Sequence, residues 1–324
     1  MEKRALGRSG IDVSRVILGC GNFGGIGSAP AFFGQGETRE SAFALMDAAW
    51  EAGITTFDTA DAYGGGRSEA WIGEWLRAKG PEVRDRIVLS TKTFNPMAEG
   101  ADSGLSRRRI LRQLDTSLQR LGVERVALYL THEPDPDTPL EETLEALGEL
   151  VGAGKVGAVG ASNVTGEQLA EALELSELEG PTAYGWVQNS YSLLDREVEE
   201  DVFPVCREHG LGFTPFSPLC GGWLTGKYRR DEELPAGSRM TLRPGPYEHL
   251  RRAEVFDALE ALEAEARGRG TTTAALALAW LLGQAQVTAI VVGPRRPEHL
   301  EPALAALHLD LSPADRDRIG AFFP

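Results

Sequence analysis

The sequence predicts a (β/α)8 TIM barrel with an N-terminal β-hairpin and a long loop after the seventh strand. Eight short apolar segments, each typical of a buried strand, are followed in turn by segments whose apolar residues recur at helical spacing. A segment at residues 3–14 with a turn-forming Arg-Ser-Gly precedes the first strand, and a Gly- and Pro-rich loop at residues 220–250 follows the seventh. Strands separated by helices run parallel, and eight such units favour a closed barrel over a doubly wound sheet.

The first half of the chain contains four strand and helix units. Aliphatic, β-branched and aromatic residues predict strands at residues 16–19, 54–57, 87–92 and 126–130. Helices are expected at residues 38–52, 70–78, 110–121 and 140–151. In the third helix, Leu114, Leu118 and Leu121 fall on one face, and Gly53 ends the first. The residues of the hairpin at 3–14 are expected to cap one end of the core.

The second half repeats the pattern with two interruptions. Strands are expected at residues 156–160, 186–188, 211–216 and 288–292. Helices are expected at residues 167–175 and 197–209, at 253–282 with a break near 268–270, and from Pro297 onward. The loop at 220–250 and a tail at 311–324 do not follow this alternation of strands and helices. A loop of that length is usually functional. We therefore interpret residues 1–324 as a single barrel domain.

Composition and charge exclude several classes of function. The formal net charge of -15 argues against nucleic-acid binding, which needs clustered Lys and Arg. The most apolar stretch, residues 274–282, is too short to span a membrane, and the charged start leads into no apolar block typical of a secretory signal. Cys20, Cys206 and Cys220 match neither a disulfide framework nor metal-ligand spacing. We expect a cytoplasmic protein without a metal site.

Residues 57–64, with the sequence FDTADAYG, place a carboxylate and a phenol five positions apart where the second strand ends. Active sites of barrels are built by the loops that follow the carboxyl ends of the strands. Taken alone, the segment fits two interpretations equally well. Asp58 and Tyr63 could be catalytic, or Asp58 could cap a turn while Tyr63 is a half-buried ring.

Three polar residues end successive strands and favour the catalytic interpretation. Asp58, Lys92 and His132 lie 34 and 40 residues apart, each about one strand and helix unit. Because neighbouring strands are roughly 4.8 Å apart, these side chains should meet at one rim, with Tyr63 reaching in from its loop. An ammonium lowers the pKa of a nearby phenol, Asp58 would keep that ammonium charged, and a neutral His132 could hydrogen-bond a substrate oxygen. This set suits proton donation to an oxygen, and it lacks the groups for hydrolysis or metal chemistry.

Six motifs resemble those of the aldo-keto reductases, and the resemblance covers nearly the whole chain. They are FDTADAYG at 57–64, STK at 90–92, THEPD at 131–135, GASN at 160–163, QNSYSLLDR at 188–196 and FSPL at 216–219. The resemblance implies a barrel that binds NADPH extended across its mouth. It also implies that hydride passes to the carbonyl carbon of a small-molecule substrate while Tyr63 protonates the carbonyl oxygen.

The same resemblance implies a set of cofactor-binding residues. Asp58 would border the cofactor, Ser162, Asn163 and Gln188 would hold the nicotinamide carboxamide, and Phe216 would stack on the ring. Ser217, Leu219, Gly221 and Gly222 would line the pyrophosphate, and Lys227 and Arg239 would close over it. At the adenosine end, the segment with Gly293, Arg295, Arg296 and His299 would contact the 2′-phosphate. Pro302 and Ala303 replace an acidic residue and an Asn that the family uses on adenine, so adenine should be held loosely.

Two other interpretations stay open at this point. The loop after the seventh strand also resembles the potassium-channel β-subunit branch of the family, which allows an NADPH-binding regulatory module with little turnover. A lyase that forms a Schiff base on Lys92 would need this lysine unpaired from Asp58. Residues 94–104, Phe23, Trp223 and the tail would form the substrate walls. The sequence carries no signal for an oligomeric state, an individual substrate or the direction of reaction in the cell.

Overall fold

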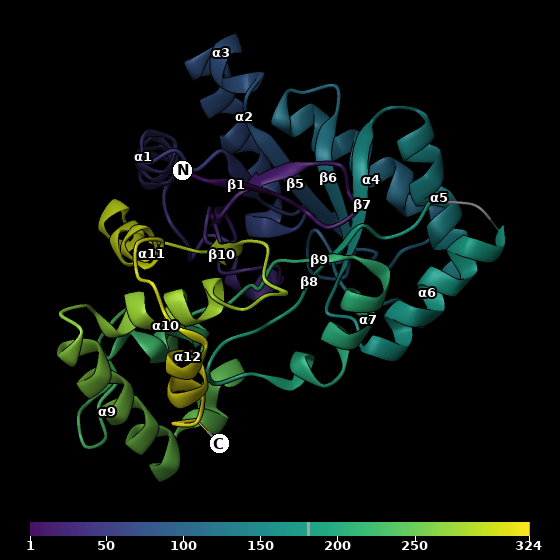
Figure 1. The fold of residues 1–324 in the computed structure, drawn as a ribbon. Helices are drawn as coiled ribbons and strands as arrows, with labels where there is room; N and C mark the ends of the chain where they lie inside the picture. Colours follow the sequence, from purple (N-terminus) through teal and green to yellow (C-terminus); the bar gives the residue numbers. More distant parts are fainter. Residues whose placement is uncertain (180–181, 324) are drawn as a thin grey trace.

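The computed structural model describes residues 1–179 and 182–323, and it contains a parallel eight-stranded sheet with helices around it (Figure 1). The order of its strands is β10-β3-β4-β5-β6-β7-β8-β9. The two ends of this sheet also meet, because Phe213 bridges Val287 and the Val291 amide donates to the Pro215 carbonyl at 2.9 Å. The sheet therefore closes into the predicted (β/α)8 barrel.

The strands lie close to their predicted positions. The barrel strands are β3 Val16–Gly19, β4 Thr56–Asp58, β5 Val88–Thr93, β6 Val126–Thr131, β7 Val156–Ser162, β8 Trp186–Gln188, β9 Gly212–Phe213 and β10 Ile290–Val292. The predicted N-terminal hairpin is present as β1 Lys3–Ala5 and β2 Asp12–Ser14, paired antiparallel. The strand predicted at 211–216 is regular only at its start. Beyond it, Ser217 and Cys220 adopt left-handed backbone angles, which end the strand and turn the chain into the long loop.

The helices form the outer layer of the barrel. Those that follow the strands are α1 Arg39–Glu51, α2 Arg67–Lys79, α4 Arg107–Leu121, α5 Leu140–Gly152, α6 Gly166–Glu179, α7 Val202–His209, α10 Thr273–Leu282 and α11 Glu301–Ala306. The additional helices are α3 Pro81–Arg84, α8 Arg239–Leu242, α9 Ala253–Gly268 and α12 Pro313–Gly320. The break predicted near residues 268–270 is confirmed, since α9 and α10 are separate helices. The helix predicted at 197–209 begins only at Val202, after a single 3-10 turn at Glu197–Glu199.

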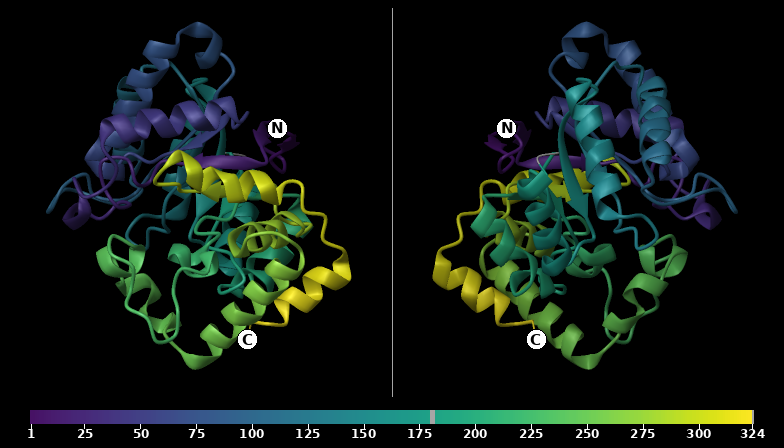
Figure 2. Two further views of the ribbon diagram at one scale, coloured as in Figure 1. Left: turned by 90° about the vertical axis from the view of Figure 1, so that its left-hand side faces the viewer. Right: turned by 90° about the vertical axis from the view of Figure 1, so that its right-hand side faces the viewer.

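Local sequence explains where the helices begin and end. The Thr38 hydroxyl accepts a hydrogen bond from the Ser41 amide and caps α1. Gly122 ends α4 with φ 67°, a conformation that is costly for residues with a side chain. Figure 2 shows the C-terminal segment running back beside α9 and α10. There the Trp280 side chain donates to the Arg316 carbonyl at 3.0 Å, so part of the predicted tail is α12 packed on the barrel.

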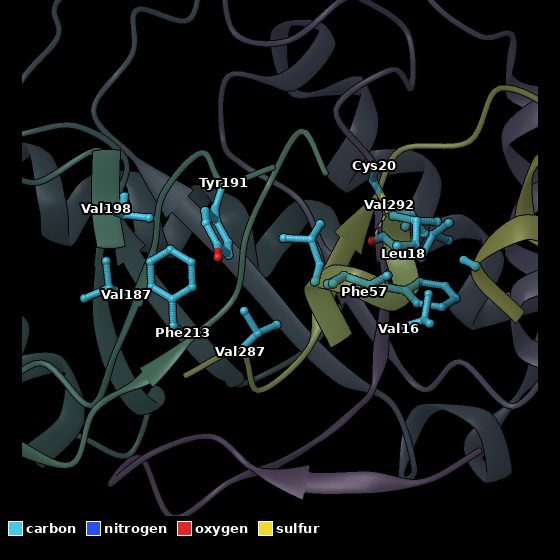
Figure 3. Close-up of a cluster of buried hydrophobic side chains, with 14 of the residues drawn as sticks. Val16, Leu18, Cys20, Phe57, Val187, Tyr191, Val198, Phe213, Val287 and Val292 are labelled. Atoms are coloured by element: carbon cyan, nitrogen blue, oxygen red, sulfur yellow. Dashed lines mark hydrogen bonds between the residues drawn. The ribbon is translucent and has the colours of Figure 1, made fainter. Parts of the chain in front are cut away.

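Alternation along the strands divides the core into two layers. Outward residues such as Val16, Leu18 and Phe57 pack in the large cluster between strands and helices (Figure 3). A separate inner cluster fills the barrel, with residues from four strands and from the hairpin region: Leu6, Val13, Ile17, Leu128, Leu130, Trp186, Ala289 and Val291. The hairpin therefore closes the end of the barrel where the strands begin, as predicted. The catalytic candidates must lie at the opposite end.

Candidate active site

Inward positions at the ends of three neighbouring strands bring Asp58, Lys92 and His132 together. Lys92 follows Thr91, whose hydroxyl reaches outward to Glu69 of α2, so alternation turns Lys92 into the barrel. The Lys92 ammonium donates to Asp58 Oδ2 at 2.5 Å and to the Thr59 carbonyl at 3.0 Å. The exposed fractions of Asp58, Lys92 and His132 are 3%, 0% and 8%. The predicted convergence of these residues at one rim is present in the structure.

The Tyr63 hydroxyl lies between the lysine and the histidine. Its oxygen is 3.5 Å from Lys92 Nζ and 3.4 Å from His132 Nε2. The loop that carries Tyr63 continues through Gly64, Gly65 and Gly66, all with positive φ. A Cβ on Gly64 would lie 2.5 Å from the Phe23 carbonyl oxygen, so this turn requires glycine to pack against the loop after β3. The glycine run thus fixes the position of the phenol.

Burial dominates the pKa values of this cluster. Burial raises the pKa of Tyr63 above its ordinary value, although Lys92 acts in the opposite direction, as predicted. Burial and the nearby Lys92 hold the pKa of His132 well below its ordinary value, so the imidazole is neutral at pH 7. Burial also opposes the charge on Lys92, but Asp58 and Tyr63 raise its pKa. The site therefore combines a protonated phenol, a charged lysine and a neutral histidine.

Asn95 is a contact that sequence reasoning missed. It lies in the loop after β5, and its Nδ2 is 3.2 Å from Nδ1 of His132. With the amide donating to Nδ1, the ring hydrogen of the neutral His132 lies on Nε2, on the side of the Tyr63 hydroxyl. A hydrogen on Nε2 can be donated to an oxygen bound beside the phenol. No strand or helix pattern marks Asn95, which explains why the sequence did not reveal it.

The residues predicted for the nicotinamide end line the next two strand ends. Ser162 Oγ donates to the Gln188 carbonyl at 2.6 Å, and Asn163 Nδ2 donates to the His132 carbonyl at 2.9 Å. Gln188 Nε2 donates to Asp58 Oδ1 at 3.3 Å, and Ser90 donates to the same oxygen at 2.8 Å. Asp58 is thereby held by three donors. Gln188 thus contacts the ion pair of Asp58 and Lys92 directly, and Ser162 is linked to it through Gln188.

The residue predicted to stack on the nicotinamide, Phe216, and those predicted to line the pyrophosphate follow β9. Phe216 and Ser217 line a cavity of about 770 Å³, together with Ser190, Cys220 and Tyr247. This cavity lies beside the predicted cofactor residues and does not include the Tyr63 and Lys92 cluster. A Cβ on Gly221 would lie 2.7 Å from the Tyr247 ring, and one on Gly222 would lie 2.5 Å from Lys227 Nζ. Leu219 precedes these glycines at the start of the 3-10 helix Cys220–Thr225.

Cationic side chains gather near the end of β10. Burial and the neighbouring Arg295 and Arg239 lower the pKa of Lys227. Burial and the neighbouring Arg296 and Lys227 also lower the pKa of His299. Arg239 donates to Asn22 Oδ1 at 2.9 Å, and the Asn22 amide reaches the Gly293 carbonyl at 3.4 Å. The predicted adenosine-phosphate residues therefore form one positive region, a suitable environment for phosphate groups.

A family assignment follows from the sequence comparisons. Residues 15–322 match the model of the Aldo/keto reductase family. The chain belongs to this family. Its fold, its polar cluster at the barrel rim and its motifs are those expected of an aldo-keto reductase. Membership identifies an oxidoreductase of the aldo-keto reductase type with a nicotinamide cofactor.

Three relatives of this aldo-keto reductase cover almost its whole length. The "Uncharacterized oxidoreductase YrpG" of Bacillus subtilis (strain 168) is 36% identical over 334 residues, 100% of this chain and 96% of its own. The "NADH-specific methylglyoxal reductase" of Escherichia coli (strain K12) is 34% identical over 329 residues, 97% and 96% of the two chains. The "Probable voltage-gated potassium channel subunit beta" of Oryza sativa subsp. japonica is 33% identical over 331 residues, 99% and 96%.

The expected substrate walls need correction at two residues. Phe23 and Trp223 were expected to form substrate walls, but both side chains are fully buried in the core, where Trp223 packs against Tyr228 and Phe256. Ala303, at a position that the resemblance implies would contact adenine, is 1% exposed and packs into the core as part of α11. A polar side chain at position 303 would have to be buried, so it is a poor means of adding a hydrogen bond to adenine.

Within residues 1–179 and 182–323, no helix combines the length and the apolar character needed to cross a bilayer. Within the same ranges, no group of three or more His, Cys, Asp or Glu side chains is arranged to hold a metal ion. Cys20, Cys206 and Cys220 are buried free thiols.

A buried acidic pair lies just behind the Tyr63 loop of this aldo-keto reductase. Asp61 Oδ2 accepts hydrogen bonds from Thr93 at 2.8 Å and Gln113 at 3.0 Å, and Arg109 approaches it at 3.9 Å. Burial, reinforced by the neighbouring Glu69, raises the pKa of Asp61 to about 7. Burial also raises the pKa of Glu69. Asp61 is therefore a group whose protonation couples folding to pH near neutrality.

The stability of the protein is expected to fall as the pH rises from about 4 to about 7. The folded state keeps a proton on Asp61 that the unfolded chain releases near pH 4, so the cost of ionising it accumulates over this range and is complete above about pH 7. Three pKa units correspond to at most about 4 kcal/mol. Asp61→Asn keeps an acceptor for Thr93 and Gln113 and should flatten this decline.

The slope of unfolding free energy against pH, from urea denaturation at pH 5 to 8, measures this effect. Asp85→Asn removes one exposed carboxylate in the same way and serves as the matched control. Comparing slopes rather than absolute stabilities cancels the constant cost of leaving Arg109 without its acidic neighbour. An Asp61→Asn slope equal to that of the unmodified protein would contradict the assignment.

Proposed function

We propose that this aldo-keto reductase is an NADPH-dependent oxidoreductase that reduces an aldehyde or ketone to an alcohol. The observation that carries the proposal is the Tyr63 hydroxyl, held 3.5 Å from the Lys92 ammonium and 3.4 Å from the neutral His132 ring. NADPH consumption with a panel of aldehydes and ketones tests it. Steady turnover supports the proposal, and NADPH binding without consumption across the panel would overturn it.

The side chains present suit a nicotinamide dinucleotide. Hydroxyl and amide groups at 162, 163 and 188 match the donors and acceptors of a carboxamide, and Phe216 offers an aromatic face. Lys227, Arg239, Arg295 and Arg296 supply positive charge for phosphates. When bound, the reduced cofactor supplies a hydride. The chain's own residues must then orient the carbonyl and provide the proton.

Three residues orient the carbonyl oxygen, protonate it and stabilise the resulting phenolate. Nε2–H of His132 donates a hydrogen bond that orients the oxygen beside the phenol. Tyr63 donates its proton to this oxygen as negative charge develops there, and Lys92 stabilises the resulting phenolate. Asp58 keeps the lysine charged and aimed through the 2.5 Å contact. Because the cluster is buried, these electrostatic effects are stronger than they would be in water.

A second candidate function is an NADPH-binding regulatory module with little turnover. It is favoured by the similarity to a protein named as a probable potassium channel subunit beta, which extends over 99% of this chain. The complete set of Asp58, Tyr63, Lys92 and His132 favours turnover instead. The Schiff-base lyase is disfavoured, because Lys92 is fully buried and paired with Asp58.

The double variant Arg295→Ala/Arg296→Ala is expected to erase most of a preference for NADPH over NADH. A 2′-phosphate beside two guanidinium groups gains charge-assisted hydrogen bonds that a hydroxyl cannot match. We expect NADPH binding to weaken by about 10- to 100-fold, with NADH changed by less than about threefold. Titration of protein fluorescence gives both dissociation constants.

The matched control for this prediction is Arg84→Ala/Arg108→Ala, which removes the same charge from exposed positions on α3 and α4. Equal dissociation constants for NADPH and NADH in the unmodified protein would refute the preference.

In this proposal, residues 1–324 form one barrel domain, and the substrate is a small carbonyl compound. A cytoplasmic location and the absence of nucleic-acid partners stay predictions from the sequence.

A further inference from the structure

Arg295, a proposed phosphate contact, is already engaged by a carboxylate of the same chain. Its Nε donates to Glu37 Oε1 at 2.6 Å, and its NH1 donates to the Gly237 carbonyl at 2.6 Å. The Glu37 side chain is 12% exposed and the Arg295 side chain 42%. Arg296, in contrast, is exposed. An anion that binds Arg295 must therefore share the guanidinium with Glu37.

Backbone pairing positions Glu37 beside Arg295. The Glu37 amide donates to the Asn22 carbonyl at 2.7 Å, and the Gly24 amide donates to the Glu37 carbonyl at 3.0 Å. These bonds form a parallel bridge between Phe23 and Glu37. A Cβ on Gly36 would lie 2.0 Å from the Gly25 carbonyl oxygen, so the two segments approach as closely as backbones can. This pairing fixes the backbone position from which the Glu37 side chain reaches Arg295.

The ion pair lies where three distant segments meet. The loop after β3 supplies Asn22 and Glu37, the long loop supplies Gly237 and Arg239, and the loop after β10 supplies Arg295. Arg243 adds a further link by donating to the Ile26 carbonyl at 3.1 Å. The Glu37 carboxylate therefore lies at the edge of the positive region formed by Lys227, Arg239 and Arg295.

A carboxylate at this place affects a phosphate and a hydroxyl differently. A phosphate group would compete with Glu37 for the guanidinium and would be repelled by its negative charge. A ribose hydroxyl can instead donate a hydrogen bond to a carboxylate, as acidic residues do in other dinucleotide sites. We propose that Glu37 is a specificity-determining residue that weakens the preference for a cofactor with a 2′-phosphate. The proposal rests on the proposed function, because it takes Arg295 as a contact of that phosphate.

Glu37→Gln tests this inference through cofactor binding rather than turnover. The amide keeps the shape of the side chain and the backbone pairing but removes the negative charge. The dissociation constant of NADPH should fall by about five- to tenfold, because the guanidinium is released and the repulsion is lost. That of NADH should stay within about threefold or rise. Glu40→Gln, at an exposed position three residues later on α1, makes the same charge change and is the control.

A double-mutant cycle with Arg295→Ala separates the two hypotheses. The part of the gain that comes from releasing the guanidinium should disappear in the Arg295→Ala background, so the effect of Glu37→Gln on NADPH binding should be smaller there and should reflect only the lost repulsion. If Arg295→Ala alone leaves NADPH binding unchanged, Arg295 is not a phosphate contact and the underlying proposal fails. If Arg295→Ala weakens NADPH but Glu37→Gln leaves the ratio of NADPH to NADH affinity unchanged, only the present inference fails. Should Glu37→Gln not fold, Glu37→Asp withdraws the carboxylate by one methylene and should shift the ratio in the same direction, and an unchanged ratio there also refutes it.

Discussion

Tyr63→Phe is expected to lower the turnover number for aldehyde reduction by about 10²–10⁴-fold or more, with NADPH binding changed by less than about threefold. The variant removes only the hydroxyl that lies between Lys92 and His132. The phenylalanine ring can keep the edge contact with His132, whose ring centroid is 5.5 Å away, so the fold of the loop should persist. Steady-state kinetics and fluorescence titration give the two quantities.

The matched control is Tyr129→Phe, which deletes the hydroxyl of another fully buried tyrosine that packs between strands and helices. Its turnover should stay close to that of the unmodified protein, even if its stability changes. A Tyr63→Phe variant with near-normal turnover would show that the proton comes from another group. The proposal of carbonyl reduction would then still stand, but the proposed role of Tyr63 as proton donor would be refuted.

Lys92→Met is expected to slow both directions of the reaction and to move the pH profile of alcohol oxidation upward. Oxidation uses the phenolate of Tyr63 as the base, so its rate rises as the pH passes the pKa of that phenol. Lys92 lowers this pKa against the larger effect of burial, and removing the ammonium therefore raises it further. We expect at least about a hundredfold loss of turnover at neutral pH. Initial rates of alcohol oxidation from pH 6 to 11 measure both effects.

Loss of stability must be separated from loss of chemistry in this variant. Removing Lys92 leaves Asp58 buried without its cation, at a cost of about 3–5 kcal/mol. The double variant Asp58→Asn/Lys92→Met removes both charges and should recover much of the stability without recovering turnover. Lys155→Met removes a partly exposed lysine that is also paired with a carboxylate, that of Asp115, and controls for the general charge change. If the pH profile of alcohol oxidation is not shifted in Lys92→Met, Lys92 has only a structural role. Borohydride trapping of a carbonyl on Lys92 in the unmodified protein would instead support the lyase.

The sequence alone determined the barrel and which residues form its candidate catalytic cluster. Alternation of apolar strands and amphipathic helices is a local property, and it specifies parallel strands whose carboxyl ends share one rim. Spacings of one strand and helix unit therefore predicted that Asp58, Lys92 and His132 meet at that rim. The structure then shows that Lys92 points into the barrel, because the neighbouring Thr91 reaches outward to Glu69.

Only the tertiary structure decided the contacts between loops and the balance of charge in the site. Asn95 beside His132 and Glu37 beside Arg295 arise because loops far apart in sequence meet at the barrel mouth, and no periodicity records such meetings. The pKa of Tyr63 was decided by burial, which depends on every segment packed around the phenol. The sequence predicted Trp223 as part of a substrate wall, but in the folded long loop this side chain is fully buried. Strand and helix patterns are set by neighbours along the chain, whereas desolvation and loop contacts are set by neighbours in space.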